Sequence, residues 1–155
     1  MDRTPITKKG YEVLKKELNN LKKVERPQNI KAIEEARAHG DLSENAEFDA
    51  AKDRQGFIEG RIGELTFKLA NADIIDTDKL PRDRAVFGSK VVVENIDTGE
   101  DVEYQLVGPE ESDIKKGRIS VSSPLGKEII GKKPGDEFAL QVPGGKRNYE
   151  LVEIL

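Results

Sequence analysis

The chain has 155 residues, of which 36% are charged and 35% hydrophobic, and its net charge is −4. This length suits one medium domain or two small ones, and the high charge is typical of a chain with a long solvated element. No apolar run approaches the roughly 18 residues that span a bilayer, and the N-terminus lacks the apolar core of a secretory signal, so we expect a cytoplasmic protein without membrane contact. The absence of cysteine excludes disulfides, thiolate nucleophiles and zinc ribbons.

The first third of the chain has the pattern of a long helix. Thr7 is a suitable N-cap and Gly40 a suitable stop, because glycine readily adopts the left-handed conformation that ends many helices. Pro27 interrupts the hydrophobic pattern and lacks a backbone donor, so we expect a kink or a register slip there. The apolar positions on either side are Tyr11, Leu14, Leu18, Leu21, Ile30, Ile33 and Ala36.

A second helix follows at once, with Asp41 or Ser43 as its expected N-cap. Its seam positions, all apolar except Gln55, follow one another in steps of three and four, which is the heptad pattern of a coiled coil. They are Phe48, Ala51, Gln55, Ile58, Ile62, Leu65, Leu69 and Ala72. Two long helices joined by so short a loop pack antiparallel. We therefore predict a coiled-coil arm over residues 1–75, roughly 40 Å long at ~1.5 Å per residue, with its tip at residues 39–46.

The remaining chain changes to the pattern of strands. Residues 76–84 are expected to form a linker, and residues 85–155 an α+β domain with an antiparallel sheet and one short helix, Pro124–Ile130, capped by Ser123. Turn signals separate the predicted strands, for example Pro134-Gly135-Asp136 and Pro143-Gly144-Gly145. The predicted strands are Ser89–Ile96, Val102–Val107, Arg118–Val121, Glu137–Val142 and Asn148–Ile154.

The expected tip carries two carboxylates three residues apart, Asp41 and Glu44. At a turn that opens a helix these groups can point the same way, and hard oxygen ligands of this kind suit Mg²⁺, which often takes only one or two protein carboxylates. The alternative is structural: an N-cap and a first-turn acid that interact favourably with the helix dipole. Spacing alone does not decide between them.

The tip sequence Ala36-Arg37-Ala38-His39-Gly40-Asp41-Leu42-Ser43-Glu44-Asn45-Ala46-Glu47-Phe48 closely resembles that of the bacterial transcript cleavage factors, the Gre family. Further matches, in family order and over nearly the whole chain, are Gly56–Ile62, Ile119–Leu125, Ile130–Lys132 and Pro143–Gly145. The continuation Asn45-Ala46-Glu47 favours the A-type branch of the family. The resemblance implies that the second domain is FKBP-like.

The resemblance also implies a function. The hairpin would enter the secondary channel of RNA polymerase, while the FKBP-like domain holds the channel rim on the largest catalytic subunit. Asp41 and Glu44 would help to hold a second Mg²⁺ and orient the attacking water, so that the polymerase hydrolyses its own backtracked RNA and releases a short 3′ fragment. The chain would then be a cofactor without nuclease activity of its own.

Further site residues follow from the same resemblance. Arg37 and Lys52 match the family's basic patch, which contacts the extruded RNA 3′ end; the alternative is solvated helix surface or an ion pair within the arm. Ser122, Ser123 and Pro124 lie near the family's polymerase-docking surface, although they most simply form a helix cap.

Two other functions remain open. The same hairpin could occlude the polymerase channel and inhibit without chemistry, although a plug has no need of paired carboxylates. An FKBP-like domain could instead be a prolyl isomerase or a peptide-binding chaperone. Such a site needs an aromatic-lined pocket, and residues 85–155 offer few aromatic side chains and no tryptophan.

Overall fold

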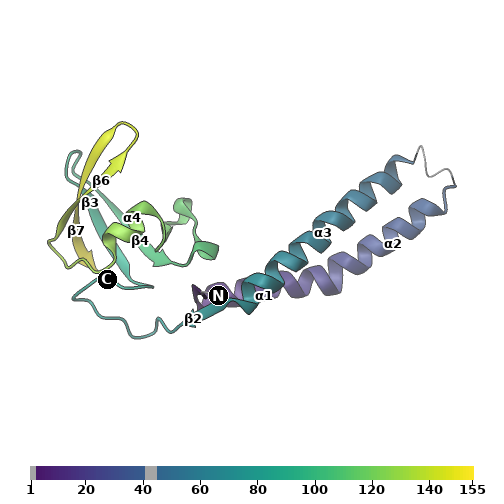
Figure 1. The fold of residues 1–155 in the computed structure, drawn as a ribbon, viewed down its shortest axis with the longest axis horizontal. Coiled ribbons are helices and arrows are strands. Elements are labelled where there is room, and N and C mark those ends of the chain that lie inside the picture. The colour runs from purple at the N-terminus through teal and green to yellow at the C-terminus, as the bar shows by residue number, and fades with distance from the viewer. Residues whose placement is uncertain (1–2, 41–44) are drawn as a thin grey trace. The chain divides into compact units, whose positions relative to one another are not determined.

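The computed structural model describes residues 3–40 and 45–155, and internal contacts divide the chain into two compact units. One unit, Tyr11–Asn71, is a helical hairpin, and the other, Met1–Gly10 with Ala72–Leu155, is built around a sheet (Figure 1). These units correspond to the predicted α+β class, an N-terminal two-helix hairpin followed by a sheet domain with one short helix. Within the described ranges, no helix combines the length and apolar character needed to cross a membrane.

The first arm of the hairpin is one continuous helical run with a change of winding in its middle. Helix α1, Lys8–Asn20, leads through a π-helical segment, Leu21–Glu25, into helix α2, Arg26–Arg37. The backbone N–H of Arg26 donates to the oxygen of Leu21, five residues back. This wider turn directly precedes Pro27, which has no backbone N–H to donate to the helix. A π-helical turn adds one residue to the helix and shifts its register, so the predicted register slip is confirmed.

Helix α2 buries two of the three apolar residues that the sequence placed on its stripe. Asn29, Ile33 and Ala36 form the buried side, whereas Ile30, which the sequence placed there, is 45% exposed. Ile30 is one residue beyond Asn29, about 100° further around the helix, and so faces away from the seam. The prediction for Ile30 was therefore wrong, and a buried asparagine takes the neighbouring position.

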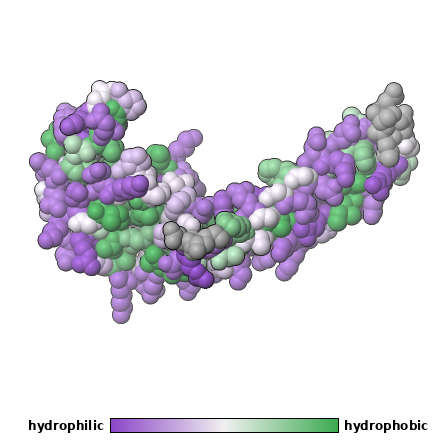
Figure 2. All heavy atoms as spheres, viewed as in Figure 1, coloured by the Kyte–Doolittle hydropathy of each residue, from purple (hydrophilic) through white to green (hydrophobic). Residues whose placement is uncertain are grey.

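Helix α3, Ala46–Ala70, forms the second arm and buries Ala51, Ile58, Ile62 and Leu65, as the heptad pattern predicts. Its N-cap is Asn45, whose side-chain oxygen accepts a hydrogen bond from the Phe48 N–H at 3.1 Å. The expectation that Asp41 or Ser43 caps this helix was wrong. Figure 2 shows hydrophilic side chains over most of the visible face of the hairpin, as expected for a narrow buried seam.

The sheet unit has a five-stranded sheet in the order β5-β4-β3-β7-β6. All neighbours are antiparallel except β4 and β5, which pair in parallel and depart from the purely antiparallel prediction. The short helix α4, Pro124–Ile129, lies where it was predicted. The strands are β3, Lys90–Asn95; β4, Glu100–Val107; β5, Arg118–Ser120; β6, Glu137–Val142; and β7, Gly145–Ile154.

Side chains from the sheet, from α4 and from the segment before β3 form the core of this unit. They are Ala85, Val91, Val93, Leu106, Ile119, Ile129, Phe138, Leu151 and Ile154. Burial alternates along β3 and β6, whereas β4 is exposed over its first half and buried at its end.

A second, two-stranded sheet was not predicted. Strand β1, Thr4–Thr7, pairs in parallel with β2, Ala72–Ile75, in the register Thr4 to Ala72. Each strand has only four residues, too short for a periodic signal, and the pairing joins segments that are far apart in the sequence. The two ends of the hairpin thus run into one small sheet that belongs to the sheet unit.

Three glycines of α3 allow a test of helix stability. A Cβ built on Gly56, Gly60 or Gly63 meets nothing within 4 Å. We expect Gly60→Ala to raise the free energy of unfolding by about 0.5–1 kcal/mol, because alanine loses less backbone entropy than glycine in a helix. Thermal unfolding followed by far-ultraviolet circular dichroism measures the change.

Gly126 in α4 is the matched control, because a Cβ there would lie 2.0 Å from the oxygen of Ser120. Gly126→Ala is expected to destabilise the protein. A Gly60→Ala variant that is less stable than the wild type would show that the open face of α3 is not free in solution.

Candidate functional site

The two carboxylates predicted to act at the tip, Asp41 and Glu44, lie outside the described residues. The structure does describe both sides of the connection that carries them. The first arm ends at Arg37 and passes into Gly40, whose φ is +100°, and the second arm begins after Asn45. The positive φ of Gly40 agrees with the predicted glycine stop.

Asn45 joins the two arms at this end of the hairpin. While its oxygen caps α3, its side-chain N–H donates to the backbone oxygen of Ala36 in α2 at 2.6 Å. One side chain thus accepts from a free backbone N–H at the start of α3 and donates to a backbone oxygen near the end of α2. Sequence reasoning gave Asn45 no role, although an asparagine three residues before the first buried-seam position is a recognisable cap signal.

Arg37 and Lys52, the predicted basic patch, are both exposed. The Arg37 Cζ lies 5.9 Å from the centre of the Phe48 ring, a cation–π contact between the arms. Lys52 lies one turn beyond Phe48, on the same side of α3, and its Nζ donates to Gln55 Oε1 at 2.9 Å. The structure therefore places both cations near the tip, each with one contact within the hairpin.

Another exposed pair lies beside them. The Nδ1 of His39 is 3.5 Å from an Oε2 oxygen of Glu47, and both side chains are exposed. Glu47 lies in the first turn of α3, where a negative charge interacts favourably with the helix dipole.

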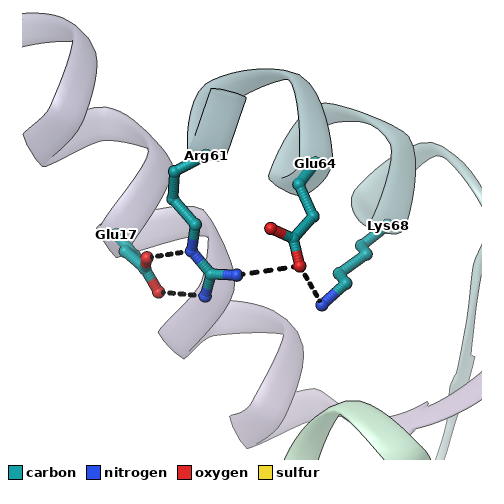
Figure 3. A network of polar contacts seen from close by, with 4 residues as sticks. All are labelled: Glu17, Arg61, Glu64 and Lys68. Carbon is teal, nitrogen blue, oxygen red and sulfur yellow. Dashed lines mark hydrogen bonds and ion pairs between the residues drawn. The ribbon is translucent and has the colours of Figure 1, made fainter. Parts of the chain in front are cut away.

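Arginine–glutamate pairs brace the hairpin behind the tip. The Arg61 guanidinium donates to both carboxylate oxygens of Glu17 at 2.6 and 2.9 Å and also contacts Glu64 at 3.1 Å, and Lys68 contacts Glu64 at 2.8 Å (Figure 3). Nearer the tip, the Arg26 guanidinium forms a second two-pronged pair with Glu59, both distances being 2.8 Å. Arg54 of α3 also pairs with Glu25 of the first arm.

These contacts shift the pKa of the carboxyl groups. Hydrogen bonding from Arg61 lowers the pKa of Glu17 below its ordinary value, against the opposing effect of partial burial. Arg26 likewise lowers the pKa of Glu59, and Lys68 and Arg61 lower that of Glu64. The pKa of the Arg61 guanidinium is raised in turn, chiefly by Glu17. All four groups are therefore held in their charged forms at neutral pH.

The second predicted surface is a groove of about 380 Å³ in the sheet domain. Ser123 and Pro124 line it, and Ile114 at its edge is 76% exposed. The Ser123 hydroxyl accepts from the Gly126 N–H at 3.1 Å and donates to the Ser120 oxygen at 2.6 Å, so it caps α4. The groove is also lined by Tyr104, Ser112, Ile119, Ser120, Leu125, Leu140, Gln141, Val142 and Pro143.

Ser122 differs from Ser123 in its contacts. Its hydroxyl lies 2.7 Å from that of Ser120, its backbone N–H donates to the same oxygen at 3.1 Å, and its side chain is exposed overall. The three residues predicted for docking thus contribute a helix cap, a first helical residue and an exposed hydroxyl next to one apolar groove.

Comparison with known families accounts for both halves of the chain. The model for "Transcription elongation factor, N-terminal" matches residues 4–74, and that for "Transcription elongation factor, GreA/GreB, C-term" matches residues 80–155. The chain therefore belongs to the GreA/GreB family of transcription elongation factors. The predicted resemblance to the Gre family is confirmed.

Individual relatives agree over nearly the whole length. "Transcription elongation factor GreA" of Thermodesulfovibrio yellowstonii is 55% identical, covering 99% of this chain and 97% of its own. The protein of the same name from Methylococcus capsulatus is 55% identical, covering 99% of this chain and 98% of its own. Among solved structures, GreA factor homolog 1 (Gfh1) of Thermus thermophilus is 30% identical over 99% of both chains, with a TM-score of 0.45.

Removing the Asn45 side chain tests its joining role. Asn45→Ala is expected to lower the free energy of unfolding by about 1–2 kcal/mol, because the cap of α3 and the bond to Ala36 are lost together. Asn45→Asp keeps the cap of α3 but replaces the side-chain donor with an acceptor. Its free energy of unfolding should therefore lie between those of the wild type and Asn45→Ala. Denaturant unfolding measures both, and equal stability of Asn45→Ala and the wild type would contradict this role.

The Glu17–Arg61 pair predicts a pH dependence. Because the folded-state pKa of Glu17 is lowered from 4.5, its stabilising contribution is complete above 4.5 and is lost as the pH falls through the lower, folded-state value. Glu17→Gln should therefore reduce stability at neutral pH, by about 0.5–1 kcal/mol for such a partly exposed pair, and lessen the loss of stability on acidification. Unfolding measured at neutral pH and below pH 4.5 tests this; parallel pH profiles for the two proteins would refute it.

Proposed function

We propose that the hairpin of this elongation factor enters the secondary channel of RNA polymerase and stimulates the polymerase's intrinsic hydrolysis of backtracked nascent RNA. A short 3′ fragment is released, the new 3′ end lies in register, and elongation resumes. The observation that carries this proposal is a braced two-helix arm, in a chain of the GreA/GreB family, whose connecting residues include the carboxylates Asp41 and Glu44.

The cap of α3 bears on the role of these two carboxylates. The structural alternative made Asp41 an N-cap and Glu44 a first-turn acid. Asn45 is the N-cap, and the acidic residues of the first turn are Glu47 and Asp49. Asp41 and Glu44 are therefore not needed for either purpose, and the case for a chemical role is stronger than spacing alone could make it.

Two carboxylates are a donor set that fits Mg²⁺, whose remaining positions would be filled by water and by groups of the polymerase and its RNA. When bound beside a second metal ion, Mg²⁺ supplies charge stabilisation for the attacking and leaving oxygens of a phosphodiester. In this role Asp41 and Glu44 raise the occupancy of a weak site and orient the attacking water. Two carboxylates are too few to form a hydrolytic site alone, so this chain acts as a cofactor and not as an independent nuclease.

The basic pair at the tip suits the extruded RNA. Arg37 is an exposed cation over the Phe48 ring, and Lys52 is a second exposed cation one turn further along α3. Cations together with an aromatic group are the usual means of holding single-stranded nucleic acid. The pair would hold the RNA 3′ segment beside the carboxylates without reading its sequence.

The sheet domain would dock on the channel rim, which is formed by the largest catalytic subunit. The apolar groove beside Ser122, Ser123 and Pro124 offers a concave surface, and exposed Ile114 at its edge offers an apolar anchor. The groove has a single aromatic lining residue, Tyr104, which makes it a poor match for the aromatic-lined site of a prolyl isomerase. Docking of a protein surface is the better assignment.

Substitution of the tip carboxylates tests the central step. Asp41→Ala and Glu44→Ala are each expected to abolish cleavage stimulation while leaving polymerase binding nearly intact, since neither side chain belongs to the docking groove. Transcript length in stalled elongation complexes measures cleavage, and competition against labelled wild type measures binding. Raising the Mg²⁺ concentration should partly restore cleavage by a single variant, because occupancy follows mass action.

Ile114→Lys is the matched control for docking, since this exposed side chain can be replaced without disturbing the core. It should weaken binding and recover full cleavage at high protein concentration. Equal loss of binding and cleavage in Asp41→Ala would make the tip an affinity element. Slower nucleotide addition with unchanged transcript length would identify the wild type as a channel-occluding inhibitor instead.

A further inference from the structure

Two adjacent pairs of lysines lie on the outer side of the first arm. They are Lys15 and Lys16 in α1, and Lys22 and Lys23 in the π-helical segment that follows. Residues three, four and seven apart share a side of a helix, so both pairs lie on one side of the arm with Asn19 between them. These five side chains are exposed, whereas Leu14 and Leu21 of the seam are buried. We call this surface the lysine face, and all of it lies within the hairpin unit.

The ion pairs of the hairpin leave the lysine face without acidic partners. Glu17 and Glu25 are the acidic residues that follow Lys16 in this part of the arm. Each is paired with α3, Glu17 with Arg61 and Glu25 with Arg54. Among the residues that the structure describes, no ion pair reaches any lysine of the face. A strongly positive surface therefore remains on a chain whose net charge is −4.

The composition of the lysine face indicates the chemistry of its partner. Its ammonium groups offer only donors and positive charge, which match the negative, purely accepting phosphate oxygens of nucleic acid. Lysine is depleted in protein–protein interfaces, which need aromatic or other apolar anchors at their centre, and the face contains none. Single-stranded nucleic acid is usually held by aromatic groups on which its bases stack, and the face lacks these as well. A duplex, whose bases are already stacked, can be held by phosphate contacts alone.

We propose that the lysine face binds the phosphate backbone of double-stranded DNA without reading its sequence. DNA is the duplex that a transcription elongation factor meets, and the face contains neither the tip residues nor the docking groove. The face spans about 12 Å at about 1.5 Å per residue, and a duplex carries one charge per about 1.7 Å, so about seven phosphates lie within that length. Such binding would keep the factor close to transcribed DNA, and it does not depend on the function proposed above.

The salt dependence of DNA binding by the full-length protein tests this proposal. Each lysine that contacts a phosphate releases a counterion and adds about −0.9 to the slope of log K against log salt concentration. Fluorescence anisotropy of a labelled duplex of about 20 base pairs, measured between about 50 and 200 mM salt, gives this slope. With four lysines available, we expect a slope of about −3 to −4 for the wild type. Replacing Lys15 and Lys16 together with glutamine, or Lys22 and Lys23 together, should make the slope less steep by about 2.

Two control variants separate the lysine face from net charge. Lys115 and Lys116 are another exposed adjacent pair, in the sheet domain, and replacing both with glutamine changes the net charge by the same amount. This variant should keep the wild-type slope. Glu12 is an exposed acid one helical turn before Lys16, so Glu12→Gln is expected to tighten DNA binding about twofold. Circular dichroism and thermal unfolding check that each variant is folded.

Each outcome decides the proposal. It is overturned if the wild type shows no binding of duplex DNA at about 50 mM salt, or if the lysine-face variants keep the wild-type slope. An equal change of slope in the control with both Lys115 and Lys116 replaced would show that net charge alone governs binding. Tighter binding of single-stranded RNA of the same length through the same lysines would overturn the assignment to a duplex. Slower association of the lysine-face variants with RNA polymerase, with DNA binding unchanged, would assign the face to an acidic protein surface instead.

Discussion

The pairing of two long helices in a single register is the constraint on which the rest of the structure depends. The buried seam provides most of the attraction, but apolar contacts are not directional and tolerate a slip by one turn. The ion pairs do not. In the observed register Glu17 faces Arg61, and a slip of one turn in one direction would bring it to Glu64, a like charge. Arg26 and Glu59 add a second pair, in which the first arm contributes the cation. The arrangement of acidic and basic side chains along the two arms therefore selects one register of helix pairing. Each exposed ion pair nevertheless contributes little to the free energy of unfolding.

Local patterns predicted most of the fold. The heptad spacing of α3 survives folding because the helix buries one face against its neighbour, and the residues of that face recur in the sequence at a fixed period. The strands β3 to β7 were recognisable as β-type runs bounded by turn signals. The Thr7 cap and the Gly40 stop were equally visible, since both depend only on nearby backbone. Ile30 was misplaced because a spacing of three before Ile33 fits an apolar stripe as well as the spacing of four by which Asn29 precedes it. Pro27 predicted a kink or a register slip in the first helix, but it gave neither the direction nor the size of the slip.

Features that depend on distant residues could not be predicted. The pairing of β1 with β2 and the Glu111 contact with Thr7 join segments that only the folded chain brings together. At the candidate site, the acidic pair and the basic pair were recognisable from residue type and family resemblance. Asn45 was overlooked because Asp41 and Ser43 are equally good caps by chemistry. Which of three adequate residues caps a helix depends on where the helix begins, and here the bond from Asn45 to Ala36 favours the last of them.

The contacts that hold the two arms together change along the hairpin. Toward the base they are apolar, with Leu14, Ile62 and Leu65 all buried. Near the far end the buried side chains are Ile33, Ala36 and Ala51, and two directional contacts join the arms as well. They are the bond from Asn45 to Ala36 and the contact of Arg37 with Phe48. Because directional contacts fix a position that apolar contacts alone leave free to slip, the two helices keep one register up to the residues that connect them. The proposed delivery of two carboxylates into another protein's active site would depend on that register.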